Sequence, residues 1–414
     1  MSIHNTIWEW EFKWGSLLEK RVFGNCKLAT MQSGYDLIED GLVEISDGVI
    51  TWVGSEKDFE GDRSNIEDIG GRLVTPGLVD CHTHIVFGGD RAKEFEMRLE
   101  GASYEEISKA GGGIVSTMHA TRLASLDELV ELALPRLDAL ISEGVTTVEI
   151  KSGYGLTVED EIKMLRAARK LSELRKVRIV TSWLAAHAVP LEFQGKSDDY
   201  IDQVAIPGLI RANAEGLIDA VDGFCEGIAF TVDQMKRVFL EAIKLNLPIK
   251  LHAEQLSNLG GAVMASNLGA LSVDHIEHLD AKDAKVLSKN GTIAVLLPGA
   301  FYTLRETKYP PVQSLRDHSV QIAIASDGNP GSSPLFSILL TMNMACTLFR
   351  LTPEEALLGV TCNAAKALGL SDIGMIKKGF AADLNIWDCK HPAELSYRIG
   401  FNSLFKRIYG GADA

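Results

Sequence analysis

Eight short apolar segments, separated by stretches with helical spacing, constrain the fold of this chain more than any other feature. Short apolar runs that alternate with helical patterns are typical of βα units around a parallel sheet. Eight such units close a (β/α)8 barrel, so the sequence predicts an α/β fold with a TIM-like barrel. The segments cover residues 72–79, 145–150, 177–185, 220–224, 248–251, 271–274, 292–297 and 321–325.

Two capping boxes indicate where helices begin between these segments. Ser125 is followed three residues later by Glu128, and Thr231 by Gln234, each ahead of an apolar-periodic stretch. Such a pair satisfies free backbone N–H groups at the start of a helix. We therefore expect one helix to start after Ser125 and another after Thr231.

The two ends of the chain have a pattern of short strands and turns. Apolar residues 42–45 and 49–53 flank Asp47-Gly48, which predicts a β-hairpin. Residues 382–387 form another short strand pattern. We therefore predict a small composite β-sandwich domain built from both chain ends and an inserted barrel domain, at residues 1–75 with 376–414 and at residues 76–375.

Charge and composition narrow the classes of partner. The net charge is −15, and an acidic surface repels phosphate backbones and anionic lipid, so we expect neither nucleic acid nor membrane as a partner. The six cysteines form no CxxC pair, which disfavours a disulfide framework and a zinc ribbon. The first residues do not resemble a signal peptide, and no apolar run reaches the ~18 residues of a membrane span. A cytoplasmic homodimer that binds a small-molecule substrate is the expectation.

Metal-ligating side chains follow the ends of several predicted strands. In a barrel, the carboxyl ends of the strands meet on one face, where the active site lies. Side chains far apart in the sequence would therefore meet there. In chain order they are His82, His84, His187, His252, His275 and Asp327.

The spacing of four of these residues predicts a catalytic metal site. His82 and His84 are two apart, so on an extended segment they point to the same side. His252 would supply a third ligand and Asp327 a fourth, with a position left for water. Imidazole and carboxylate ligands suit zinc or iron. We expect one divalent or trivalent ion per chain, and the sequence leaves the choice of metal open.

Ordered motifs identify a family resemblance. Residues 76–84, Pro-Gly-Leu-Val-Asp-Cys-His-Thr-His, resemble the first-strand signature of the amidohydrolase superfamily. From about residue 24 to the C-terminus, the chain resembles the imidazolonepropionase family within that superfamily. The motifs that carry this resemblance lie at residues 87–91, 101–104, 110–114, 149–156, 186–190, 252–255, 274–278 and 326–332.

The resemblance implies a ring-opening hydrolysis in histidine degradation. Its substrate would be 4-imidazolone-5-propanoate, opened at the cyclic amide bond to N-formimidoyl-L-glutamate. A metal that lowers the pKa of bound water from ~16 toward ~7 is consistent with attack on the ring carbonyl. Asp327 would be both ligand and proton acceptor, and His275 would polarise the carbonyl or hold the oxyanion. The leaving ring nitrogen then needs a proton.

Glu254 and Gln255 leave the proton path open. Many related enzymes carry an acid three residues after the fifth-strand histidine, whereas Gln255 occupies that place here. If the segment stays extended, Glu254 lies on the side of His252 and Gln255 on the opposite side, and a turn would change this. Glutamine carries no proton but can hydrogen-bond the ring. We expect Gln255 to bind substrate and Glu254 to carry a proton, with His275 as the alternative.

The propanoate tail of the implied substrate needs an anchor. The guanidinium of Arg91 matches a carboxylate bidentately and follows the first predicted strand. Tyr154, which lies between two glycines, and Tyr104 would donate hydroxyl hydrogen bonds to the same carboxylate. His187 would form a hydrogen bond with the ring or its carbonyl. Further contacts are expected from Asn329, Gly331 and Ser332.

Two alternatives remain at this point. The first is another amidohydrolase that acts on a cyclic amidine or a nucleobase, such as a deaminase, and ammonia release would identify it. The second is a metal-free scaffold with the same barrel. Scaffolds of that kind usually lose the ligands, whereas all four remain in this chain.

Overall fold

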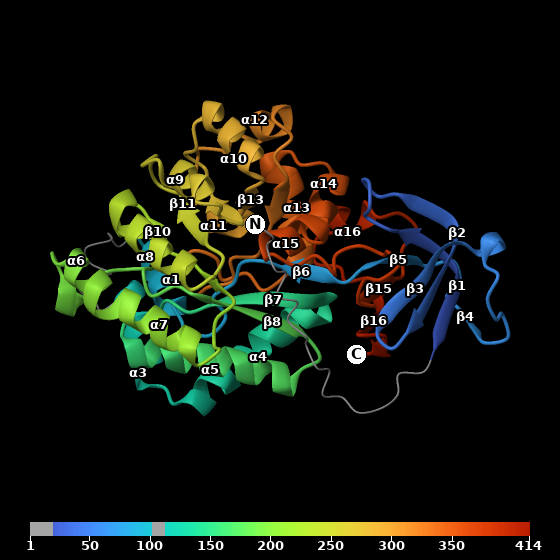
Figure 1. Ribbon diagram of the computed structural model, residues 1–414, viewed down its shortest axis with the longest axis horizontal. Helices are drawn as coiled ribbons and strands as arrows, with labels where there is room; N and C mark the ends of the chain where they lie inside the picture. The colour runs from blue at the N-terminus through green and yellow to red at the C-terminus, as the bar shows by residue number, and fades with distance from the viewer. Residues whose placement is uncertain (1–19, 102–111) are drawn as a thin grey trace.

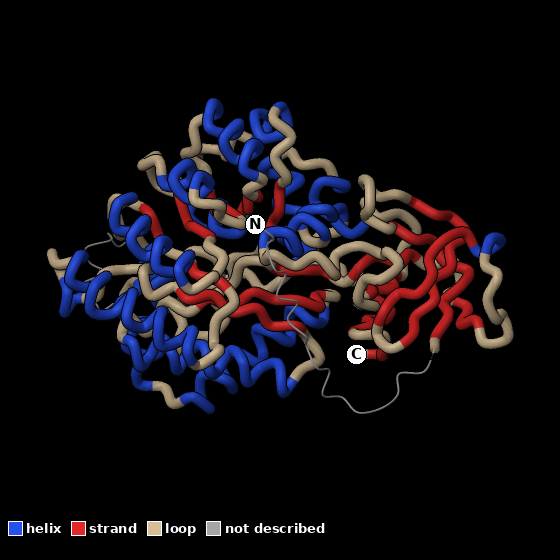
Figure 2. The backbone as a smooth tube through the Cα atoms, viewed as in Figure 1, coloured by secondary structure: helices blue, strands red, loops and turns tan. Residues whose placement is uncertain are grey.

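The computed structural model describes residues 20–101 and 112–414. Figure 1 shows the middle of the chain as a curled sheet with helices around it, and both chain ends side by side in a second sheet. Figure 2 separates the helices that cover the curled sheet from the strand-rich region at the other end. Within the described parts of the chain, no helix has the length and apolar character needed to cross a membrane.

The curled sheet is parallel throughout and follows the chain order that the sequence predicts. Its strands pair in two groups, β6 to β9 and β10 to β14. Isolated parallel bridges join the groups at both seams, between Val221 and Ile249 and between Thr83 and Gly328. The strands are β6 Leu78–Asp80, β7 Val145–Lys151, β8 Arg178–Trp183, β9 Ala220–Val221, β10 Phe224–Cys225, β11 Lys250–Ala253, β12 Ser272–His275, β13 Ile293–Leu296 and β14 Ile322–Ile324.

Helices fill the connections between these strands, and both expected capping boxes are present. The Ser125 hydroxyl accepts the Glu128 N–H ahead of α4, and Thr231 accepts the Gln234 N–H ahead of α8. The helices are α1 Ala92–Leu99, α3 Ile114–Leu123, α4 Leu126–Ser142, α5 Val158–Leu174, α6 Ser197–Tyr200, α7 Ile206–Ala214, α8 Val232–Lys244, α9 Gly261–Asn267, α10 Ala284–Asn290, α11 Pro298–Leu304, α12 Val312–Asp317, α13 Ile338–Phe349, α14 Pro353–Gly359, α15 Cys362–Ala367 and α16 Glu394–Tyr397.

The chain ends share one eight-stranded sheet. The expected hairpin is present, because β2 and β3 pair antiparallel around Asp47 and Gly48, whose φ angles of 52° and 75° suit a tight turn. The composite β-sandwich and its boundaries stay predictions. The strands are β1 Arg21–Ala29, β2 Leu37–Ser46, β3 Val49–Ser55, β4 Ile66–Asp68, β5 Leu73–Pro76, β15 Leu384–Trp387, β16 Leu404–Tyr409 and β17 Ala412–Asp413.

Two expected strands are each divided in the structure. Residues 72–79 form β5 in the terminal sheet and β6 in the parallel sheet, because the chain crosses between the sheets at Gly77. A Cβ at Gly77 would overlap the Thr146 side chain, so this crossing requires glycine. Residues 220–224 likewise divide between β9 and β10. The apolar pattern continues across both breaks because each piece is buried, so the sequence alone hides the divisions.

Candidate active site

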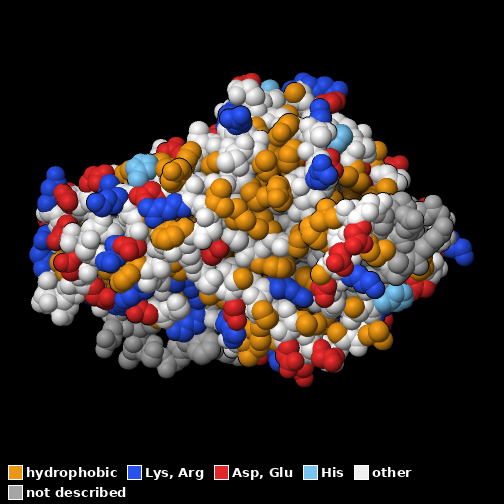
Figure 3. Space-filling view, turned by 180° about the vertical axis from the view of Figure 1, so that it is seen from behind, with side chains coloured by type: hydrophobic (Ala, Val, Ile, Leu, Met, Phe, Trp, Pro, Cys, Tyr) orange, Lys and Arg blue, Asp and Glu red, His pale blue; other side chains and the backbone are white. Residues whose placement is uncertain are grey.

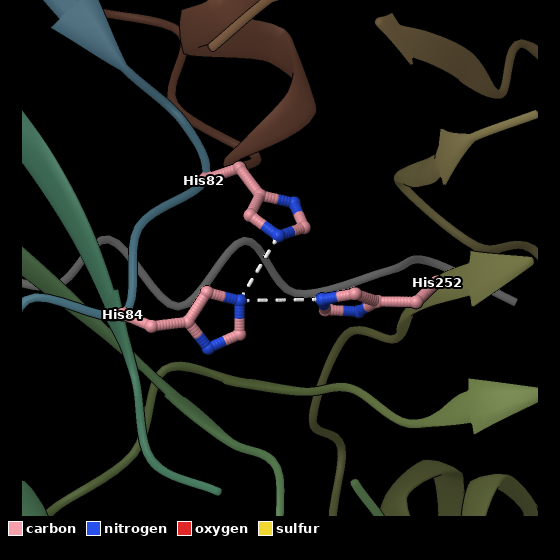
Figure 4. Close-up of side chains that lie close together, drawn as sticks. All are labelled: His82, His84 and His252. Atoms are coloured by element: carbon pink, nitrogen blue, oxygen red, sulfur yellow. Dashed lines mark hydrogen bonds between the residues drawn. The ribbon is translucent and has the colours of Figure 1, made fainter. Parts of the chain in front are cut away.

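Three histidines converge at the carboxyl ends of the parallel strands. His82 and His84 follow β6, and His252 lies on β11 (Figure 4). The His84 Nε2 atom lies 3.2 Å from His82 Nε2 and 3.4 Å from His252 Nε2. All three side chains are buried, so the curl of the sheet brings together the residues that the sequence predicted to meet.

Asp327 joins this group from the segment that follows β14, the last strand of the parallel sheet. Its Oδ1 atom lies 3.4 Å from His82 Nε2 and 3.5 Å from His84 Nε2. The Asp327 N–H donates to the His82 carbonyl, and its φ of 53° is a left-handed conformation that few non-glycine residues adopt. Ser326 donates its hydroxyl to Asp80 at 2.5 Å across the seam. Asp80 thus supports the seam that carries Asp327.

Carboxylates orient two of the histidine rings from behind. His82 Nδ1 donates to Asp274 at 2.6 Å, and His252 Nδ1 donates to Asp222 at 3.2 Å. A carboxylate accepts only, so the contact places a proton on Nδ1 of each ring and leaves Nε2 as the atom that can ligate. Outer partners of this kind hold metal-ligating histidines in the correct tautomer.

The donor set fits a metal cation. Burial lowers the pKa of His82 and of His84 well below the usual value, so both rings are neutral, as ligation requires. The lone pairs of His82 and His252 face the same point beside His84. Within the described residues, the buried Asp327 Oδ2 atom has no hydrogen-bond partner. A cation between the Nε2 atoms would accept these lone pairs, and the three histidines could hold one.

Further aromatic side chains wall the site. The His187 ring stacks on His84 with centroids 5.4 Å apart and an interplanar angle of 19°. His187 Nδ1 donates to the Gly153 carbonyl, and burial lowers the pKa of this ring to about 4. Tyr154 is buried, and its ring lies 5.4 Å from that of His187. The structure thus brings His187 and Tyr154 to the histidine cluster.

His275 completes the wall from β12. Its ring centroid lies 5.4 Å from that of His252. The φ angles of His275 and Ile276 are 77° and 61°, and such a conformation is costly for a β-branched residue. The buried His275 Nδ1 has no partner in the described part of the chain. Strained backbone of this kind gathers at functional sites.

Glu254 and Gln255 do not continue the strand. β11 ends at Ala253, and the φ of 52° at Glu254 turns the chain. The segment is therefore not extended, so the alternation of sides expected for an extended strand does not apply to Glu254 and Gln255. The Glu254 carboxylate accepts the N–H groups of Gly261 and Ala262 at the start of α9, both at 2.8 Å. Burial raises the pKa of Glu254 to about 7. Gln255 is 8% exposed.

Arg91 borders a cleft of about 340 Å³ beside the site, which Asn329 and Gly331 also line. Arg91 Nε donates to Thr117 at 2.9 Å, which leaves its terminal nitrogens against Gly331. The Asn329 side chain accepts the N–H groups of Gly331 and Ser332 at 2.8 Å, so it orders the loop under Arg91. Tyr104 lies outside the described residues.

Sequence reasoning missed the charged side chains behind the histidines. Asp222 and Asp274 lie at strand ends and contact the ligand rings, and the buried Lys151, Lys250 and Glu149 lie next to them. The available signal was a set of charged residues inside apolar strand segments. Such residues are almost never fully buried without partners.

Two kinds of comparison place the chain among known proteins. A family model described as "Amidohydrolase family" matches residues 73–408. The chain is 60% identical over 392 residues to an imidazolonepropionase of Paracoccus denitrificans, covering 94% of this chain and 98% of the relative. It is also 60% identical over 394 residues to an imidazolonepropionase of a Ruegeria species, covering 94% and 97%.

Solved structures share the fold at lower identity. A triazine hydrolase variant superposes with a TM-score of 0.74 at 17% identity, covering 95% of this chain and 94% of that one. A 5-methylcytosine deaminase from Klebsiella pneumoniae gives 0.72 at 17% identity, covering 95% and 96%. An atrazine chlorohydrolase from Arthrobacter aurescens, in complex with zinc, gives 0.70 at 16% identity, covering 95% and 94%.

Proposed function

This chain belongs to the amidohydrolase family and, within it, to the imidazolonepropionases, and from this premise we propose that it hydrolyses the cyclic amide bond of 4-imidazolone-5-propanoate. The product is N-formimidoyl-L-glutamate, and the reaction is a step in histidine degradation. The observation that carries the proposal is the identity of about 60% over 94% of the chain to imidazolonepropionases. The chain is therefore a hydrolase that acts on C–N bonds.

One zinc or iron ion held by His82, His84, His252 and Asp327 is the cofactor we propose. The support is the convergence of the three Nε2 atoms and the Asp327 carboxylate, with Asp274 and Asp222 holding two of the rings. A bound ion would supply Lewis-acid activation of water and of the ring carbonyl.

Three side chains are assigned to proton and charge handling. Asp327 accepts the proton of the attacking water, and its Oδ2 atom has no other partner among described residues. His275 faces the cluster and holds the negative charge that develops on the carbonyl oxygen. Glu254, with a pKa raised by burial to about 7, carries a proton toward the leaving ring nitrogen.

The polar groups of the cleft bind the substrate in this proposal. Arg91 pairs with the propanoate carboxylate through its terminal nitrogens, since among the described residues only its Nε has a hydrogen-bond partner. The hydroxyl groups of Tyr154 and Tyr104 donate hydrogen bonds to that carboxylate, and His187 forms a hydrogen bond with the ring. The remaining substrate contacts we propose are Gln255, Asn329, Gly331 and Ser332.

A homodimer is the assembly we propose. Figure 3 shows hydrophobic side chains gathered over the middle of one face of the molecule. Tyr397, Ile399 and Phe401 are at least half exposed, at 79%, 70% and 53%. Association buries exposed apolar side chains of this kind. Light scattering behind a size-exclusion column measures the mass directly.

A coupled assay on the purified protein tests the function. The expected result is loss of 4-imidazolone-5-propanoate with formation of N-formimidoyl-L-glutamate and no ammonia. Release of ammonia from a purine or pyrimidine, with no ring opening, would overturn the proposal in favour of a deaminase. Metal analysis of the same sample is the second measurement. Absence of bound metal, with no gain in activity when zinc or iron is added, would indicate a metal-free scaffold.

A further inference from the structure

A group of five charged side chains lies in the interior of the parallel sheet, behind the histidine cluster. Each of these side chains has no exposed surface. They come from segments far apart in the sequence, and the proposed function assigns no task to the glutamate and the two lysines among them. The five, called the buried charge group below, are Glu149, Lys151, Asp222, Lys250 and Asp274.

Lys151 is the centre of the buried charge group. Its Nζ atom lies 2.7 Å from Asp222, 2.9 Å from Glu149 and 3.9 Å from Asp274. Lys250 Nζ lies 2.6 Å from Glu149 and 3.9 Å from Asp274, and it also donates to the Cys81 carbonyl. Each lysine therefore bridges carboxylates that come from different strands.

The pleat of the strands fixes this group relative to the histidines. Lys250 and His252 are two residues apart on β11, so both point into the interior. Glu149 and Lys151 share a side of β7 in the same way. The buried charge group is thus the next inward layer of residues behind the ligand side chains.

Two members of the group touch the ligand histidines. Asp222 accepts from His252 Nδ1 at 3.2 Å, and Asp274 accepts from His82 Nδ1 at 2.6 Å. Lys151 contacts both carboxylates, so one ammonium connects the outer partners of two ligands.

The charge balance of the group gives Lys151 its importance. Three carboxylates face two ammonium groups, and a buried charge without a partner is strongly destabilising. Among the described residues, Lys151 is the one lysine or arginine within 4.0 Å of the Asp222 carboxylate. Without Lys151, Asp222 would lose its one ammonium partner among the described residues and would keep only the Gly223 N–H, at 2.7 Å, beside His252.

We propose that Lys151 is a positioning residue of the metal centre, which holds Asp222 so that the ring of His252 presents Nε2 to the ion. This inference rests on the metal site of the proposed function. The Lys151 ammonium is paired with carboxylates, so it acts through them.

The experiment measures zinc affinity by chelator competition, starting from zinc-loaded protein. Lys151→Met is expected to weaken zinc binding by about 10-fold, the lower end of the range for losing an outer partner itself, because Lys151 lies one contact further out. Cobalt-substituted protein supplies a second readout, because displaced histidine rings change its visible absorption spectrum. Unchanged zinc affinity in folded Lys151→Met would overturn the proposal.

A double variant separates positioning from general support of the fold. Asp222→Asn alone should weaken zinc binding. Adding Lys151→Met to Asp222→Asn should weaken zinc binding no further, because Lys151 acts through Asp222. The double variant also removes lysine and carboxylate together, so it remains informative if Lys151→Met does not fold. A further loss of affinity in the double variant would refute action through Asp222.

Arg169→Met is the matched control. Arg169 pairs with Asp219 at 2.9 Å on the outer side of the sheet, so its loss should reduce stability and leave zinc affinity unchanged. Equal weakening of zinc binding in Arg169→Met and Lys151→Met would mean that Lys151 only supports the fold. Failure of the ring-opening assay with intact zinc binding would instead refute the proposed function and leave this inference standing.

Discussion

Substituting alanine for Gly331 tests how closely Arg91 must be placed. A Cβ at position 331 would overlap Arg91 Nη1 and lie 3.0 Å from Cζ. Nonbonded heavy atoms separate at about 3.5 Å or more, so Cζ would withdraw by about 0.5 Å and Nη1 by more. The backbone at Gly331 is outside the left-handed region, so alanine fits the local conformation, and among the described residues the clash falls on Arg91.

The expected magnitude follows from the hydrogen bonds of a carboxylate. A hydrogen bond to a charged group contributes ~1.5–3 kcal/mol. Loss of one of two bonds from Arg91 to the propanoate would therefore raise KM by about 10- to 150-fold. Stability and metal content should stay at wild-type values, because the clash involves the end of one flexible side chain.

Steady-state kinetics on 4-imidazolone-5-propanoate, with thermal unfolding and metal analysis of the same samples, measures these effects. Gly227→Ala is the matched control, since a Cβ there meets no atom of the described part of the chain within 4 Å. An unchanged KM in Gly331→Ala would show that Arg91 does not hold the tail carboxylate in the observed position.

Three further predictions concern the metal, the tail anchor and pH. His82→Ala should abolish activity by loss of the ion, and full metal content in this variant would contradict the assigned ligands. Arg91→Ala should raise KM strongly while the metal stays bound; a wild-type KM would remove Arg91 as the anchor. Burial raises the pKa of Glu277 from its ordinary 4.5 to about 8. The folded state then holds a proton that the unfolded state has lost, so the free energy of unfolding should fall as pH rises between these values. Glu277→Gln should flatten that slope in urea titrations, and an unchanged slope would assign the effect to other groups.

Much of the fold could be predicted because it depends on local patterns. Apolar runs alternating with capped helices are a property of neighbouring residues, so the order of the parallel strands and the starts of α4 and α8 followed from the sequence. The hairpin at Asp47 and Gly48 followed from turn chemistry in the same way. The histidines and Asp327 were predicted to meet because barrel strands deliver their carboxyl ends to one face.

The tertiary structure decided what depends on contacts between distant segments. The crossing at Gly77 is set by the approach of Thr146, and the turn at Glu254 is accompanied by carboxylate bonds to the start of α9. The pairing of Lys151 with Asp222 joins residues 71 positions apart. Periodicity records which side chains are buried, whereas the partner of a buried charge is fixed only when the sheet curls and excludes water around both groups.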